Sequence, residues 1–523
     1  MSRTDSDGDE RTGRVFVREA TGLVKSVSLL DAFSINLGSM SVGPALGTIG
    51  ATMVLVPSVS GLNLVYASLL SALFTIPMVV VYVMMLGRMS RTGGDYVWIS
   101  REFGGLFGGS LALSGFVVAA MAFAALSAIA GVFAIGSVGV QLGNLNFLGL
   151  ALPNGIKGSN PAAQVSVIAA IFVVLFLINI LRPKWGLRVA SGMMIFTLIA
   201  LFLAIAVLFS AGRPGVDQYV SYLNASGANV TYNSVVSSYS GSSFNLNNTL
   251  FILPFFSIFA YPYFNVGPAM GSEFRGRNTG RYAIPLAVIL GAITLTLGFG
   301  AMYYAAGIGF TNSALSNSNL VFDYSFNFWT LAMGATSSVV LQYIIGLGWI
   351  VGLMLLVAVD MVVIPRYLFG MSFDRFLPQK MAEVNSRFGS PVYAQATFAL
   401  IAFVMAALAT YLYGTFVSLY GAVAATMIFF VFVGLSAVLL GLKSKSDRHR
   451  YGLVAAGVLM AAVFGYFAYD FFAYPTVWGG NPLAYGFSSV AFVIGIVLYL
   501  TMRRRLSKEG IDLSLAFKEI PPE

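Results

Sequence analysis

The sequence contains no cysteine, a single histidine and few charged residues. Without cysteine there is no disulfide and no thiolate metal site. The one histidine, His449, lies in a short basic stretch, which excludes a buried histidine proton relay. The chain offers no nucleophile with a base, no metal cluster, no paired intramembrane aspartates and no Gly-Lys-Ser/Thr nucleotide motif. We therefore expect no enzyme, no cofactor, no metal and no direct ATP drive.

Charge is scarce because most of the chain is apolar: charged residues make up 9% of it and hydrophobic residues 58%. That ratio excludes an ordinary soluble globule. A helix needs about 20 apolar residues to cross a bilayer, and the chain holds about a dozen such stretches. The sequence therefore predicts an all-α polytopic membrane protein with twelve transmembrane helices. The predicted spans are residues 28–56, 62–87, 108–138, 162–181, 187–210, 248–274, 282–308, 336–369, 392–412, 415–441, 451–471 and 484–502.

The Lys and Arg residues are distributed unevenly between the two sides of these spans. All 29 of them except Lys157 and Arg213 lie in the tails or in connections on the same side as the tails. Cytoplasmic loops carry such an excess, so both termini should be cytoplasmic in a multi-pass protein of the cell membrane. The net charge of +9 then requires no nucleic-acid partner. Residues 1–27, which show no signal-peptide pattern, and residues 503–523 are the predicted cytoplasmic tails.

The outer connections are different, and the longest predicted one covers residues 211–247. It is rich in Ser, Asn, Tyr and Gly and is expected to be an extracellular loop. Acceptor-like triplets for N-glycosylation occur there or directly after it. These triplets begin at Asn224, Asn229 and Asn247, and the sequence leaves open whether any is modified.

The strongest local signal is an interruption of span 6 at residues 259–263 (FAYPY). Pro262 removes a backbone donor and should break the helix. In hydrocarbon, freed backbone groups are tolerated only where they face protein or a water-filled cavity, so a broken helix at membrane depth indicates a binding site. The alternative is a proline kink without a ligand.

Span 1 contains an echo of the same segment. Residues 42–47 (VGPALG) resemble residues 266–271 (VGPAMG), and in both spans the copy follows the expected break. Corresponding interruptions in the two halves of a transporter point to its binding site. Span 1 should break within residues 38–43, with Pro44 and Pro268 opening the second half-helices, where a missing N–H costs little.

Two half-helices that meet at midplane present free N–H groups on one side of the gap and free carbonyls on the other. That pair of ends suits a zwitterion, with its carboxylate at the N–H groups and its ammonium at the carbonyls. Neither break contains a charged residue, which disfavours strongly cationic or anionic substrates. Tyr261 and Tyr263 should shape the pocket for the substrate's side chain. The candidate substrate-binding residues are Gly38, Ser39, Met40, Ser41, Phe259, Ala260, Tyr261, Pro262 and Tyr263.

Three motifs in order resemble the amino acid–polyamine–organocation superfamily of permeases. The motifs are residues 259–264 with Glu273 and residues 281–285, residues 91–101 (RTGGDYVWISR), and residues 366–371 with Asp374, residues 376–378 and Pro391. The resemblance implies two inverted five-helix repeats, residues 28–210 and 248–441, followed by two further helices within residues 442–502. It also implies that spans 1 and 6 bind the substrate. A compact Gly-Ser-Gly in span 1 is replaced here by residues 38–41 (GSMS), and Thr197 stands where some proton-coupled members carry a lysine.

Intramembrane carboxylates are few, and Asp360 stands out because apolar residues flank it on both sides. Arg366 lies six residues further on, rotated by about 240°, and so is not its partner. An ionisable group at that depth is a candidate for ion or proton coupling, and a structural pair with a neighbouring helix is the alternative. Asp31 and Asp470 are expected to be interfacial and solvated, and Glu273 to anchor nearby arginines.

These observations favour a secondary active transporter for an amino acid, working by alternating access and driven by a proton or sodium gradient. Asp360 would take the proton, or would hold sodium together with Thr197 and span 1 carbonyls. A transporter of another small amine or organic cation and a non-transporting nutrient sensor on the same fold are the alternatives. The sequence does not name the substrate, the ion or the oligomeric state. Trp478 and Tyr485 are expected to be anchors at the membrane interface.

Overall fold

The computed structural model describes residues 25–518 except residues 144–159, 182, 243, 277, 386–388, 413–418, 420, 422, 424 and 425. Most of the expected N-terminal tail, Lys157 and the first part of span 10 therefore lie outside the described residues. Within the described residues the protein is helical and contains 12 helices long and apolar enough to cross a membrane. The predicted number of spans and the all-α class are confirmed.

The spans are formed as follows. Spans 1 to 5 are α1 (Leu29–Ser39) with α2 (Val42–Thr52), α3 (Leu64–Arg88), α4 (Asp95–Gly104) continuing to α6 (Ala119–Gln141), α7 (Pro161–Leu181) and α8 (Pro183–Ala225). Spans 6 to 8 are α10 (Leu246–Phe251) with α11 (Leu253–Phe259) and the 3₁₀ helix η6 (Tyr261–Ala269), α12 (Thr279–Ser316) and α14 (Val339–Phe373). Spans 9 to 12 are α15 (Val392–Tyr411), α17 (Thr426–Lys443), α18 (Arg450–Ala473) and α20 (Pro482–Lys508).

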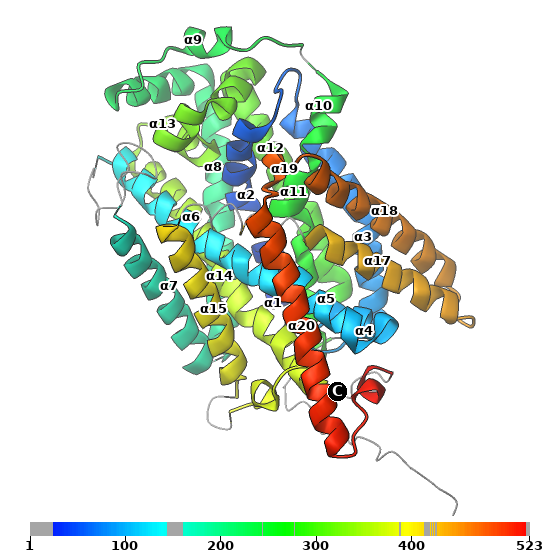
Figure 1. Ribbon diagram of the computed structural model, residues 1–523. Coiled ribbons are helices and arrows are strands. Elements are labelled where there is room, and N and C mark those ends of the chain that lie inside the picture. Colours follow the sequence, from blue (N-terminus) through cyan, green and yellow to red (C-terminus); the bar gives the residue numbers. More distant parts are fainter. Residues whose placement is uncertain are drawn as a thin grey trace, which may run out of the picture.

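The helices form one bundle around α14 (Figure 1). Every residue of α14 from Leu355 to Ser372 is buried, because α1, α6, α8 and α15 all pack against it. A helix that is apolar all round belongs in such a central position. On the flanks, α7 lies beside α15 and α17 lies beside α18 (Figure 1). Span 8 is therefore the centre of the bundle, covered by spans 1, 3, 5 and 9 and in contact with η6 of span 6.

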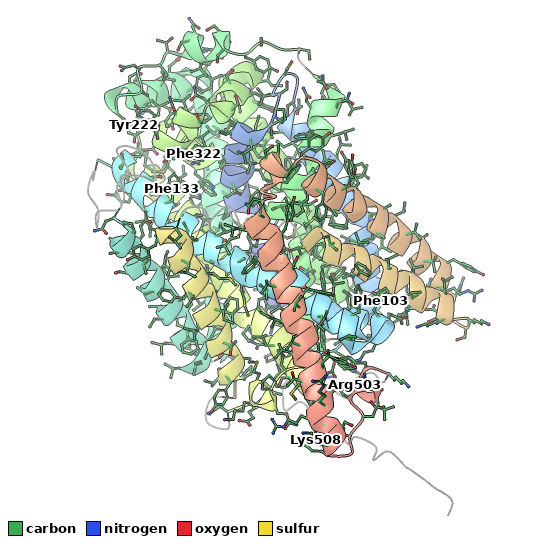
Figure 2. The ribbon with its side chains drawn as sticks, viewed as in Figure 1. Phe103, Phe133, Tyr222, Phe322, Arg503 and Lys508 are labelled. Atoms are coloured by element: carbon green, nitrogen blue, oxygen red, sulfur yellow. The ribbon has the colours of Figure 1, made fainter. Side chains whose placement is uncertain are left out.

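The two ends of the bundle differ in charge (Figure 2). Arg503 and Lys508 of α20 lie at one end, which we call the basic end, and Tyr222 lies at the opposite end. At the basic end Arg88 pairs with Asp447, and Lys443 pairs with Glu102 at 2.6 Å. The separation of charge along the bundle agrees with the uneven distribution of Lys and Arg in the sequence.

Residues 211–247, expected to be a loop, contain helical structure. After a kink at Gly212, with φ of 51°, α8 continues to Ala225, and α9 (Tyr232–Ser237) follows. Val216, Tyr219 and Leu223 are buried, at a spacing of three and four residues. This narrow apolar stripe packs against α13 (Phe328–Gly334), and the Ser- and Asn-rich composition of the segment conceals it.

Two expected interfacial groups are buried instead. Trp478 is 0% exposed, and its ring lies 4.1 Å from that of Phe255, because the short helix α19 (Pro475–Trp478) turns the chain back onto span 6. Asp470 is 3% exposed rather than solvated. Tyr485 is half-buried, against Phe471 and Phe472. The predictions for Trp478 and Asp470 were wrong because a position near the end of a span does not reveal which face of a helix a neighbour covers.

Candidate substrate and ion site

The break in span 1 lies where the sequence predicts it. α1 ends at Ser39, Met40 caps it, and α2 begins at Val42. Between them Ser41 has φ of 50° and ψ of 36°, the left-handed conformation. That conformation costs a residue with a Cβ roughly 1–2 kcal/mol, so the chain is strained at the break. Backbone strain of this kind is concentrated at functional sites.

The break in span 6 is also present, but the chain continues in an unexpected form. α11 ends at Phe259, and Ala260 adopts φ of −141° and ψ of −83°. The segment from Tyr261 to Ala269 is a 3₁₀ helix, so the second half does not open as an α-helix at Pro268 as predicted. Pro262 and Pro268 each lack an N–H, which weakens the α-helical alternative. Both breaks are confirmed, and the two second halves differ.

Two predicted pocket residues point into neighbouring helices. The Tyr261 hydroxyl lies 3.0 Å from the Ser68 hydroxyl and donates to the Ser68 carbonyl at 3.1 Å. Tyr261 thereby ties span 6 to span 2. Met40 packs on span 7, where a Cβ added at Gly291 would lie 2.7 Å from its terminal methyl group. The other predicted substrate residues are buried or half-buried at the breaks.

Asp360 lies beside the break in span 1. It is 2% exposed, and no hydrogen bond reaches its Oδ2 atom from any described residue. The adjacent Val359 contacts span 1, since a Cβ added at Gly38 would lie 3.0 Å from it. The Tyr263 hydroxyl is likewise buried, and the Thr426 hydroxyl and the Asp360 carboxylate lie near it. Spans 6, 8 and 10 thus bring three polar side chains into one neighbourhood.

Thr197 occupies a different level of the bundle. Its methyl group packs between Gly43 and Gly352, where added Cβ atoms would lie 3.2 and 3.0 Å away, and its hydroxyl oxygen is buried without a partner. Gly352 precedes Asp360 by eight residues, which is about 12 Å along a helix axis. The structure therefore brings Thr197 to the second half of span 1 and Asp360 to Tyr263, but does not bring the two candidates together.

Further buried polar atoms without partners surround the breaks, and the sequence analysis missed them. They are Ser34 Oγ and Asn36 Oδ1 of α1 and Asn265 Oδ1 of η6. Asn36 lies directly against Gly267, so its side chain lies between spans 1 and 6. An unsatisfied buried group costs about 1–3 kcal/mol, which a bound polar guest would recover. Asn36 and Asn265, asparagines within predicted membrane spans, were the available signal.

Asp95, the first residue of α4, was missed as well. It is 0% exposed and accepts three hydrogen bonds: from the Tyr82 hydroxyl at 2.6 Å, from Asn265 Nδ2 at 3.0 Å and from the Tyr367 hydroxyl at 2.8 Å. Gly94 permits this close packing, because a Cβ there would lie 2.8 Å from the Ala269 nitrogen. The cluster joins spans 2, 3, 6 and 8 near the basic end.

Two buried ion pairs close the same end of the bundle. Glu273 accepts from Arg366 Nε at 3.1 Å, which confirms Glu273 as an arginine anchor and gives Arg366 a partner other than Asp360. Arg101 pairs with Asp374 at 2.5 Å, and Tyr96 donates to the same carboxylate at 2.9 Å. Both pairs connect residues near span 8 to another span.

The opposite end is closed by α13. Trp329 is fully buried, and its Nε1 donates to the Gly43 carbonyl at 3.0 Å, one residue into α2. Side-chain contacts thus lie on both sides of the breaks, toward each end of the bundle. Among the described residues, no group of three His, Cys, Asp or Glu could hold a metal ion.

Apolar helices that cross a membrane twelve times, with spans 1 and 6 interrupted at facing positions, define a permease with a discontinuous-helix site. A family model described as amino acid permease matches residues 27–499. The chain belongs to this family, within the amino acid–polyamine–organocation superfamily, and is thus a transporter of amino acids or related compounds. Membership points to a transporter rather than an enzyme.

A viral protein is also similar to part of the chain. It is described as uncharacterized protein 399 of Sulfolobus islandicus rod-shaped virus 1 and is 32% identical over 90 residues. The match covers 17% of this chain and 22% of the viral protein. The chain thus matches about a fifth of that relative's length, and the likeness carries no functional argument.

Proposed function

We propose that this permease moves a zwitterionic amino acid across the cell membrane by alternating access, coupled to a proton or sodium gradient. The basic end faces the cytoplasm, as do both termini, because Lys and Arg are retained on that side. The spans rock around a fixed site at the two breaks.

The proposed substrate site is the space between the break in α1–α2 and the break in α11–η6. The substrate carboxylate meets the free N–H groups at the start of α2, and its ammonium meets carbonyls at the end of α11. Asn36 supplies a further polar contact through its Oδ1 atom, which no described residue reaches with a hydrogen bond. Strain at Ser41 supports this assignment, because a packing kink alone does not require a left-handed serine.

Coupling is assigned to Asp360, and the observation that carries it is a buried carboxylate oxygen without a hydrogen-bond partner. An intramembrane carboxylate of this kind must take up a proton or a cation to remain in place. Thr197 contacts Gly352, which lies about 12 Å from Asp360 along α14, so we expect that one sodium ion is not held by both. Proton coupling therefore involves Asp360, and sodium coupling at Thr197 would use its hydroxyl with span 1 carbonyls.

A second candidate function is transport of a small amine or organic cation. The proximity of Asp360 to Tyr263 in the span 6 break favours it, because a carboxylate there could pair with the substrate's ammonium directly. In that case Asp360→Asn abolishes substrate binding. In the coupling role the same variant still binds and exchanges substrate.

The deciding experiment uses purified protein in two assays. A thermal-shift screen of the common amino acids and simple amines, with and without sodium and at two pH values, identifies the ligand by linkage. Wild type and Asp360→Asn are then compared in proteoliposomes for accumulation against a gradient and for exchange. We expect Asp360→Asn to exchange substrate and to lose accumulation, with Asp217→Asn, which changes an exposed carboxylate, behaving as wild type. Full accumulation by Asp360→Asn would refute the coupling role.

A further inference from the structure

Three Asn-X-Ser/Thr triplets lie at the end of the bundle opposite the basic end, and the structure separates them. We infer that Asn229 is an N-glycosylation site and that Asn224 and Asn247 are not. The inference rests on the proposed orientation, in which this end is extracellular, and is independent of the transported substrate.

Asn224 closes the last turn of α8 with both ends of its side-chain amide. Its Nδ2 donates to the Val230 carbonyl at 2.7 Å, and its Oδ1 accepts the Val230 N–H at 2.7 Å. The nitrogen that would carry a glycan is therefore committed to holding the turn of residues 224–230. Attaching a sugar to it would compete with this two-point clamp.

Asn247 is exposed, but the threonine of its triplet is not accessible from solvent. It lies inside α10, and Thr249, which completes the triplet, is 0% exposed. The Thr249 hydroxyl donates to the Asn245 carbonyl at 2.8 Å and accepts the Asn63 N–H at 3.1 Å. An enzyme that must read both the asparagine and the hydroxyl two residues later cannot reach this pair without unfolding the start of span 2.

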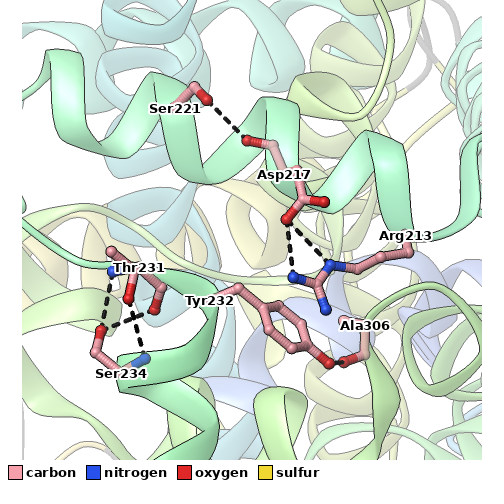
Figure 3. Close-up of polar contacts among 7 residues, drawn as sticks. All are labelled: Arg213, Asp217, Ser221, Thr231, Tyr232, Ser234 and Ala306. Atoms are coloured by element: carbon pink, nitrogen blue, oxygen red, sulfur yellow. Dashed lines mark hydrogen bonds and ion pairs between the residues drawn. The ribbon is translucent and has the colours of Figure 1, made fainter.

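Asn229 has the opposite properties. It is exposed, makes no side-chain hydrogen bond to any described residue, and has φ of 51°, a left-handed conformation that asparagine tolerates better than most residues. Thr231 is exposed too, and its hydroxyl accepts the Ser234 N–H at 3.1 Å, which leaves its own proton free (Figure 3). Both groups of the triplet are thus accessible in the folded protein.

The turn that carries Asn229 is held in place from both sides. The Tyr232 hydroxyl donates to the Ala306 carbonyl at 2.9 Å (Figure 3). Its ring stacks on that of Phe310, with the ring centroids 4.9 Å apart. The guanidinium of Arg213 lies over the same ring and pairs with Asp217 (Figure 3). A glycan on Asn229 would project from this anchored turn without displacing any of these contacts.

The co-reactant is an oligosaccharide joined through a phosphate to a membrane lipid. The Asn229 amide nitrogen forms a bond to the anomeric carbon of the first sugar and loses one proton. The bond between that carbon and the phosphate oxygen breaks, and the lipid phosphate leaves with the electron pair. The step is a substitution at the anomeric carbon and needs no oxidant or reductant.

The test expresses the full chain in a host whose secretory membranes carry an oligosaccharyltransferase. We expect one endoglycosidase-sensitive increase in mass, located on the Asn229 peptide by mass spectrometry. Asn229→Gln and Thr231→Ala should abolish it, whereas Thr231→Ser, Asn224→Gln and Asn247→Gln should retain it. No added mass on wild type, or a glycan on Asn224 or Asn247, overturns the inference.

Because the natural chain has no cysteine, the orientation is checked separately. Ala228→Cys is the only thiol in its variant and is treated with a membrane-impermeant maleimide on intact cells or sealed right-side-out vesicles. Labelling without glycosylation overturns the modification site and leaves the orientation intact. No labelling until the membrane is permeabilised overturns the orientation, and the modification site with it.

Discussion

Asp95 and Asp360 are two aspartates with nearly equal burial, 0% and 2% exposed, and opposite surroundings. Asp95 accepts hydrogen bonds from three side chains on three other helices. Asp360 has an oxygen that no described residue reaches. Burial alone therefore does not identify a functional carboxylate in this protein. The number of hydrogen-bond donors around a buried carboxylate distinguishes a structural role from a candidate binding site.

The difference follows from where each residue lies in its helix. Asp95 begins α4, where backbone N–H groups and the positive end of the helix dipole favour a carboxylate. Asp360 lies inside α14, where the backbone N–H groups are used by the helix itself. Only a side chain, water, an ion or a substrate can satisfy a carboxylate in the second position.

The largest expected effect is loss of stability in Asp95→Ala. Removing the carboxylate leaves two tyrosine hydroxyls and an asparagine amide buried without an acceptor, at about 1–3 kcal/mol for each group. We expect a stability loss of about 3–5 kcal/mol, measured as a large decrease in melting temperature in detergent. Asp512→Ala, which removes an exposed carboxylate that accepts the Ser514 N–H, is the control and should lose less stability. A melting temperature equal to wild type would mean that the cluster contributes nothing to the closed basic end.

Asp360→Asn should produce the reverse pattern, with a large functional effect and little change in stability. The variant removes a buried charge that has no described partner at Oδ2, so its melting temperature should equal or exceed that of wild type. Its accumulation ratio in proteoliposomes should fall to about one, because coupling is lost. A strongly destabilised Asp360→Asn protein would show instead that the carboxylate has a structural partner.

Ser41→Gly tests whether strain at the break is intrinsic to the backbone. Glycine adopts positive φ without the Cβ penalty, so the variant should gain about 1 kcal/mol, seen as a higher melting temperature without ligand. The gain should be absent in Ser39→Gly, because Ser39 is helical. If Ser41→Gly is the less stable variant, the Ser41 side chain contributes more than the strain costs.

The smallest effect concerns Asp447, a partly exposed carboxylate outside the spans. The His449 backbone N–H and then the Arg88 guanidinium hold the pKa of Asp447 below its usual value. A lowered pKa in the folded state stabilises above the unfolded value of about 3.9 and loses that contribution as the pH falls through the folded pKa. The melting temperature of wild type should slightly exceed that of Asp447→Asn at pH 7, and the difference should shrink as the pH falls below about 3.9. A difference that persists at low pH would assign it to something other than ionisation.

The spans and the breaks were predictable because their signals are local. Each of these signals can be read from consecutive residues: runs of about 20 apolar residues, Pro262 in mid-span, and Lys and Arg grouped in alternate connections. Asp360 was identified for the same reason, from the apolar residues on either side of it. The Gly93–Asp95 segment was noted only as part of a resemblance.

What the sequence did not show depends on contacts between distant parts of the chain. The partners of Asp95 lie 13, 170 and 272 residues away, and only the folded bundle brings them together. The direction of Tyr261 toward Ser68, 193 residues away, and the burial of Trp478 are of the same kind. The 3₁₀ form of the second half of span 6 likewise requires packing against four helices, α1, α3, α12 and α14.

The 3₁₀ form of η6 makes the second half of span 6 longer than an α-helix of the same residues. A 3₁₀ helix rises about 2.0 Å per residue and an α-helix about 1.5 Å, so the nine residues of η6 cover about 18 Å instead of about 13.5 Å. Rewinding them as an α-helix would shorten the segment by about 4.5 Å. A change between the two helical forms would therefore alter the length of span 6 by nearly one turn of α-helix without a hinge loop. The chain directly after η6 is attached to span 8 through the ion pair between Glu273 and Arg366.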